Sequence, residues 1–146
     1  MKKITFIGKE FIVLIFFISK VYGEFQSENL HVINYESGEM CKAHMGLKDD
    51  KILTDLQDGK YNEENAVLTA KCLAKCILEY LQIIEFGEYS AKRIFNLFFF
   101  NGYLSDYDAK DLAEKCEIEL NEDDVSCEKQ FQIFICLRSN QHILGH

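Results

Sequence analysis

Cysteine spacing constrains the fold of this 146-residue chain more than any other feature of its sequence. Cys72 and Cys76 are four residues apart, which in a helix puts their Cβ atoms about 5–6 Å apart, whereas a disulfide needs about 3.5–4.5 Å. Cys127 and Cys136 are nine residues apart, so in a helix they lie about 13 Å apart along the axis, on opposite faces. Neither pair is expected to form a bond within itself. The six cysteines are Cys41, Cys72, Cys76, Cys116, Cys127 and Cys136.

The first 23 residues have the layout of a secretory signal peptide. Lys2 and Lys3 precede an apolar run over 11–19, and we expect cleavage after Gly23. The apolar run is far shorter than the ~20 residues that span a bilayer, so a membrane anchor is the weaker interpretation. Residues 24–146 are expected to form one secreted domain.

The six cysteines of a secreted chain predict three disulfides. Six cysteines can pair in 15 ways, and the two exclusions above leave ten, among which spacing does not choose. Zinc is the alternative, but zinc sites usually combine two short-spaced pairs, and the C-x3-C here has no matching pair. The histidines form no ligand motif either, so we expect no metal; they are His31, His44, His142 and His146.

The charge of the chain argues against nucleic acid as a partner. The formal net charge is −8. Residues 1–23 contribute +3 of it, so residues 24–146 are near −11. A molecule this acidic is repelled by phosphate backbones and by anionic lipid surfaces.

The hydrophobic pattern predicts an all-α fold of about six helices. The clearest helix is 63–84, where apolar residues recur at spacings of three and four. No segment sustains a period of two, so no sheet is expected. The β-prone stretch 131–135 is the main ambiguity, and the cysteine spacing around it favours a helix. The helices are expected over 27–46, 48–58, 63–84, 90–101 with Ser90 as its cap, from Ser105 or Asp106 to about 118, and from Asp123 or Asp124 to about 138.

The ordered cysteine set resembles that of the six-cysteine insect odorant-binding proteins, which include general odorant-binding and pheromone-binding proteins. The specific marks are Cys72-x3-Cys76 and Cys127-x8-Cys136, with intermediate intervals of the right size, after a signal peptide. The resemblance covers essentially all of residues 24–146. It implies helices that enclose an apolar cavity, and three interlocked disulfides: Cys41–Cys76, Cys72–Cys127 and Cys116–Cys136. The chain departs from the family's usual pattern in having no proline.

Three groups of apolar residues are candidate walls of that cavity. The richest segment is 94–100, whose apolar arc is wider than one core contact needs. Ordinary core packing is the alternative for each of these residues. A tyrosine hydroxyl is a candidate for orienting a polar group of the ligand, since such pockets use few polar groups. The candidates are Leu73, Ile77, Tyr80, Leu81, Ile84, Ile94, Phe95, Phe98, Phe99, Tyr103, Phe131, Phe134 and Ile135.

No catalytic site is predicted, because the sequence has no nucleophile elbow, H-E-x-x-H helix, phosphate loop or dinucleotide fingerprint. No cofactor is expected. The resemblance implies a monomer or weak homodimer that carries small hydrophobic molecules, odorant-like or pheromone-like, through an aqueous secretion to a membrane receptor or another sink. Two alternatives keep the same fold: a scavenger in saliva, venom or reproductive fluid, and an effector that acts through its surface.

Overall fold

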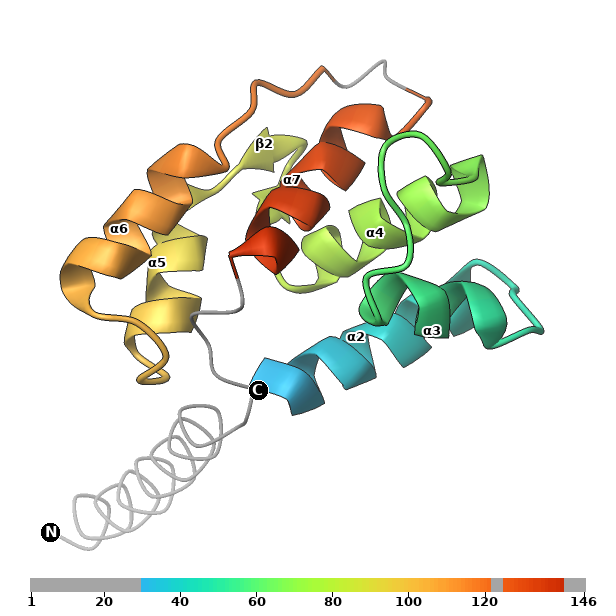
Figure 1. Cartoon of the computed structure of the whole chain (residues 1–146), viewed down its shortest axis with the longest axis horizontal. Helices are drawn as coiled ribbons and strands as arrows, with labels where there is room; N and C mark the ends of the chain where they lie inside the picture. The colour runs from blue at the N-terminus through green and yellow to red at the C-terminus, as the bar shows by residue number, and fades with distance from the viewer. Residues whose placement is uncertain (1–29, 122–124, 141–146) are drawn as a thin grey trace, which may run out of the picture.

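The structure is a computed structural model that describes residues 30–121 and 125–140, and these form six helices and one short hairpin (Figure 1). The prediction of an all-α fold with six helices is confirmed. The predicted signal peptide lies outside the described residues. The elements are α2 (Leu30–His44), α3 (Lys51–Gln57), α4 (Leu68–Tyr80), β1 (Ile84–Glu85), β2 (Glu88–Tyr89), α5 (Ala91–Phe99), α6 (Asp106–Lys115) and α7 (Glu128–Ser139).

Helix α7 lies in the middle of the molecule, between α4 on one side and the paired helices α5 and α6 on the other (Figure 1). Helices α2 and α3 pack against α4 from the side away from α5. Phe131 of α7 is fully buried, as are Leu73 of α4 and Ile94 of α5. The core therefore runs through the space around α7, and each of the three groups of predicted cavity residues contributes at least one buried side chain to it.

Two serine caps fix where α5 and α6 begin, as the sequence predicts. The Ser90 hydroxyl accepts a hydrogen bond from the backbone N–H of Arg93, at 3.2 Å. The Ser105 hydroxyl accepts one from the backbone N–H of Asp108, at 3.1 Å. Each cap satisfies a backbone donor that the first helical turn leaves unpaired.

Helix α4 is shorter than the predicted 63–84 at both ends. At its start, Asn62 Oδ1 accepts hydrogen bonds from the N–H groups of Glu64 and Asn65, both at 2.9 Å. This side-chain turn competes with helical bonding, so the helix begins only at Leu68. At the other end the chain leaves the helix after Tyr80.

The expectation of no sheet is wrong, because the chain after α4 forms a hairpin. Ile84 pairs with Tyr89 and Glu85 with Glu88, antiparallel. The turn residues Phe86 and Gly87 both have positive φ, 54° and 78°, as a two-residue type I′ hairpin turn requires. Strands of two residues are too short to show an alternating pattern, which is why the sequence does not reveal them.

The other helix boundaries differ from the predicted ones by a few residues. The β-prone stretch 131–135 lies inside α7, so the helical interpretation is confirmed. Helix α7 starts at Glu128, directly after Cys127, whose φ of 57° excludes it from the helix; residues 123 and 124 lie outside the described residues. Helix α6 ends at Lys115 rather than near 118, and α3 covers 51–57 rather than 48–58.

All six cysteines form disulfides, with the pairing that the resemblance implied. Cys41–Cys76 joins α2 to α4, Cys72–Cys127 joins α4 to the start of α7, and Cys116–Cys136 joins the end of α6 to α7. The bonds span 35, 55 and 20 residues respectively. In the chain-entropy model, each bond stabilises the fold by roughly 3–4 kcal/mol. Helix α7 is thus held from two sides.

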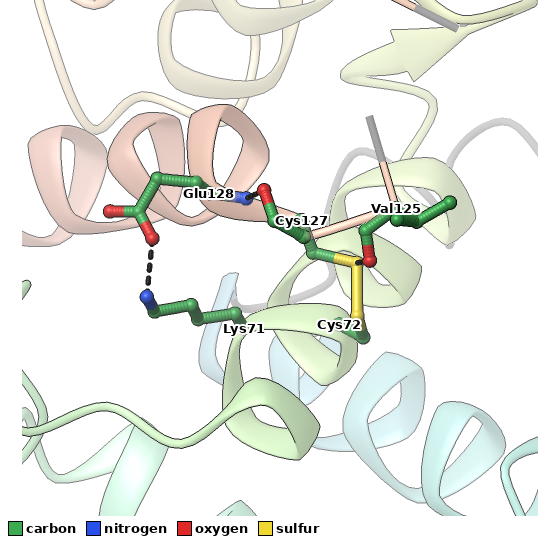
Figure 2. Close-up of a disulfide and its surroundings, with 6 residues drawn as sticks. Lys71, Cys72, Val125, Cys127 and Glu128 are labelled. Atoms are coloured by element: carbon green, nitrogen blue, oxygen red, sulfur yellow. Dashed lines mark hydrogen bonds and ion pairs between the residues drawn. A yellow bond between two sulfur atoms is a disulfide. The ribbon is translucent and has the colours of Figure 1, made fainter. Parts of the chain in front are cut away.

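An ion pair reinforces the bond between α4 and α7. Lys71 and Glu128 are the neighbours of Cys72 and Cys127, and their side chains form an ion pair beside the disulfide (Figure 2). Both side chains are partly buried, with 18% and 33% of their surface exposed. The disulfide keeps the two charges close, which reduces the entropy lost when they pair.

Candidate functional site

The predicted wall on α4 and the hairpin lies entirely in the protein interior. Leu73, Ile77 and Leu81 are buried on the inner face of α4 and its end, and Ile84 is buried in β1. They belong to one continuous apolar core with residues of α5, α6 and α7. The structure therefore brings these four residues together, although Leu81 and Ile84 lie beyond the end of α4 and not on the predicted helix.

The aromatic segment on α5 divides into two groups. Ile94 and Phe98 are buried in the core. Phe95 and Phe99 are only partly buried, and their rings stack with centroids 5.1 Å apart. The ring of Phe100, which is 56% exposed, lies edge-on to Phe99 at 5.2 Å. Phe95 and Phe99 thus form an aromatic cluster at the edge of the core. Of the four candidates on α5, only Ile94 and Phe98 are buried in the core itself.

The tyrosine candidates differ in position. Tyr80 is 51% exposed, so it lies at the surface of the described structure rather than against the core. Tyr103 is partly buried and packs on the core. A third tyrosine is used structurally: the Tyr89 hydroxyl donates a hydrogen bond to the backbone carbonyl of Ala113. Burial, assisted by the charge of Glu117, raises the pKa of Tyr89.

The candidates on α7 face a cleft at the surface. The cleft has a volume of about 260 Å³ and lies between the C-terminal half of α7 and the chain that leaves α3. Phe131 lies at its base and is fully buried, whereas Phe134 and Ile135 are partly buried. Its apolar lining is Leu56, Tyr61, Phe131, Phe134 and Ile135, and its polar lining is Asp58, Gly59, Arg138 and Ser139.

Arg138 is the cation of this cleft. Its side chain is partly buried, and its guanidinium lies against Gly59: a Cβ built on that glycine would be 2.5 Å from Arg138 Nε. Burial lowers the pKa of Arg138, and the negative charge of Asp58 acts in the opposite direction. Gly59 has a φ of 74°, a conformation that only glycine adopts without strain. The glycine therefore provides both the turn after α3 and the space for the guanidinium.

The sequence interpretation missed the polar end of this cleft. It assigned Phe131, Phe134 and Ile135 to a wall and gave Arg138 no role. These four residues have the spacing i, i+3, i+4 and i+7, which places them on one helical face. The signal was therefore available on α7, whereas the approach of Gly59 to Arg138 depends on tertiary packing.

The comparison with protein families decides what kind of protein this is. The model of the PBP/GOBP family matches residues 25–140, a segment that contains all six cysteines. The chain belongs to the PBP/GOBP family. This is the odorant- and pheromone-binding family that the cysteine pattern resembles, so that interpretation is confirmed. No curated protein and no solved structure matches the chain.

The PBP/GOBP family is a family of small-ligand binding proteins rather than enzymes. Within residues 30–121 and 125–140, no group of three or more histidine, cysteine or acidic side chains is placed to hold a metal ion. In the same part of the chain, no helix is long and apolar enough to cross a membrane.

Two side-chain oxygens in the described part of this PBP/GOBP domain are buried without a hydrogen-bond partner, and they are Asn101 Oδ1 and Gln130 Oε1. Gln130 of α7 is 4% exposed, and its Oε1 atom has no hydrogen bond within the described structure. A buried acceptor left unpaired costs roughly 1–3 kcal/mol. Most buried polar atoms are paired with protein groups or with ordered water.

Proposed function

We propose that this protein is a secreted carrier that binds small hydrophobic molecules, odorant-like or pheromone-like, and carries them through an aqueous secretion. The observation that carries the proposal is the match to the PBP/GOBP family over residues 25–140. Binding is driven by the transfer of apolar ligand surface out of water, at about 25 cal/mol per Å².

The disulfide framework supports a binding site that is formed before the ligand arrives. Helix α7 is joined to α4 and to the end of α6, and α4 is also joined to α2. A site whose walls are fixed in this way loses little conformational entropy on binding. We propose that the buried candidates Leu73, Ile77 and Phe131, with the partly buried Phe134 and Ile135, contribute to the ligand-binding surface.

Secretion belongs to the same proposal. Disulfides form and persist in oxidising compartments such as the secretory pathway, and all six cysteines of this chain are paired. The family match begins at residue 25, which fits the predicted cleavage after Gly23. Delivery to a membrane receptor is the proposed end of the carrier's path.

An effector that acts through its surface is the second candidate, and one observation favours it. Phe86, at the tip of the hairpin, is 91% exposed, and Val125 before α7 is 89% exposed. Exposed apolar side chains that form a contiguous patch mark protein-contact sites, whereas single ones are found on ordinary surfaces. This alternative keeps the fold and requires no ligand.

Titration with an apolar fluorophore tests the proposal. The full chain is expressed in eukaryotic cells, and oxidised protein is collected from the medium, which also tests secretion. Saturable binding of N-phenyl-1-naphthylamine with a micromolar Kd is the expected result. Absence of binding by a folded, fully oxidised sample contradicts the carrier proposal and favours the surface-acting alternative.

A further inference from the structure

We propose that the cleft between α7 and the chain leaving α3 binds a medium-chain carboxylate, whose apolar chain lies on Phe131, Phe134 and Ile135 and whose head group is bound by Arg138. This inference rests on the proposed carrier function and names the ligand class for one site.

The floor of the cleft is continuous along one face of α7. Phe131, Phe134, Ile135 and Arg138 occupy positions i, i+3, i+4 and i+7 of the helix, so three apolar side chains lead along the helix to one cation. Leu56 and Tyr61 close the opposite side. An elongated amphiphile fits this arrangement, with its tail toward Phe131 and its head toward the C-terminal end of α7.

The guanidinium of Arg138 is available to a ligand. Within residues 30–121 and 125–140, its side chain has no hydrogen bond and no ion pair. The negative charge of Asp58 influences Arg138, but Asp58 is exposed and forms no ion pair with it. A cation that is partly withdrawn from water without a partner gains more from a bound anion than a fully solvated cation does.

The donor geometry selects the ligand's head group. A guanidinium has five N–H donors in a planar fork and no acceptor, which matches the two oxygens of a carboxylate. An alcohol offers one acceptor oxygen, and a protonated amine is repelled. Asp58 repels an anion weakly, so its charge limits the affinity for a carboxylate without reversing the preference.

The volume of the cleft sets the length of the ligand. The cleft volume of about 260 Å³ lies just below the roughly 300–1,000 Å³ of pockets that enclose drug-sized ligands, so the cleft suits a smaller molecule. Octanoate has ten non-hydrogen atoms, and its head group lies at the open end, so it is a suitable probe. Acids with chains twice as long would extend out of the cleft into solvent.

Isothermal titration calorimetry of the oxidised full chain with octanoate, octanol and octylamine tests this inference. The three probes share one chain length, so differences in affinity report the head group. The expected order of affinity is octanoate, octanol, octylamine. Arg138→Gln is expected to weaken octanoate binding about tenfold and octanol binding less than twofold, the size expected for a charge-assisted hydrogen bond at a partly exposed site. Asp58→Asn is expected to strengthen octanoate binding about twofold, because it removes a repulsive charge.

Lys92→Gln is the matched control, since it removes one positive charge from an exposed position on α5. It is expected to change octanoate binding by less than twofold. Circular dichroism confirms that each variant is folded, and Arg138→Lys, which keeps the charge but loses the planar fork, is expected to bind with intermediate affinity.

The outcomes separate this inference from the carrier function. If the fluorophore binds but octanoate binding is unaffected by Arg138→Gln, the carrier function stands and the assignment of this cleft is wrong. If octanol and octanoate bind equally to the unsubstituted protein, the carboxylate preference is wrong. If neither the fluorophore nor any eight-carbon probe binds, both proposals fail.

Discussion

Replacing Gly59 by alanine tests the geometry of the cleft, and the chain provides two matched controls. Gly46, Gly59 and Gly102 all have positive φ, at 70°, 74° and 76°. An alanine in this region costs roughly 1–2 kcal/mol of backbone strain. A new Cβ at Gly46 or Gly102 would meet nothing within 4 Å, whereas at Gly59 it would be 2.5 Å from Arg138 Nε and 3.1 Å from Arg138 Cζ.

The expected magnitude follows from this difference. Gly46→Ala and Gly102→Ala are expected to lower the free energy of unfolding by about 1–2 kcal/mol each. Gly59→Ala has the same backbone cost and also displaces the guanidinium. Because Arg138 is long and flexible, its side chain is displaced rather than the backbone. A side chain pushed off its preferred rotamer adds about 0.5–1.5 kcal/mol. The additional cost disappears in a protein that already carries Arg138→Ala.

Urea denaturation of the oxidised proteins measures this cycle. We expect a coupling of about 0.5–1.5 kcal/mol between Gly59→Ala and Arg138→Ala, and none between Gly46→Ala and Arg138→Ala. Gly59→Ala is also expected to weaken octanoate binding, because the displaced guanidinium no longer faces the cleft. A Gly59→Ala cost no larger than that of Gly46→Ala, or an additional cost that persists without Arg138, would show that Gly59 does not provide the space for the guanidinium.

Three further predictions concern the framework around α7. Replacing Cys72 and Cys127 by alanine removes the bond that spans 55 residues and is expected to lower the free energy of unfolding by about 4 kcal/mol. Replacing Cys116 and Cys136, whose bond spans 20 residues, is expected to lower it by about 3 kcal/mol. Urea denaturation measures both values, and the reverse order would contradict the dependence on loop length. A double-mutant cycle on Lys71 and Glu128 is expected to give a coupling energy of about 0.5–1 kcal/mol. This coupling energy is expected to decrease once the adjacent disulfide is removed. An unchanged value would show that the disulfide does not position the ion pair. Gln130→Met is expected to raise the free energy of unfolding by about 1 kcal/mol in thermal melts, because it removes an unpaired buried acceptor. A clear loss of stability would indicate that Gln130 is paired in solution.

Much of the fold could be predicted because its signals are local. The caps at Ser90 and Ser105 and the helical character of 131–135 follow from residues within one or two turns of each other. The disulfide pairing was different, since spacing left ten pairings open and only the family resemblance selected the observed one. The hairpin could not be predicted, because its two-residue strands form through a turn at Phe86 and Gly87 rather than through an alternating pattern.

The candidate site was predictable only in part, and for a related reason. Helical spacing identified residues that share a face, such as Leu73 and Ile77, and these are buried together. It could not show that Phe98 reaches the core while Phe95 and Phe99 stack at its edge. Such a division depends on how α5 is rotated against α6, which is set by the packing of the whole domain.

The most direct test of the carrier function compares the oxidised protein with the fully reduced protein in one fluorophore titration. The account predicts saturable binding of N-phenyl-1-naphthylamine at one site with a micromolar Kd for the oxidised form, and loss of that binding after reduction, because the three disulfides hold α2, α4 and α7 in place. An oxidised, folded protein that leaves the fluorophore unbound, or a reduced protein that binds it equally well, would contradict the account.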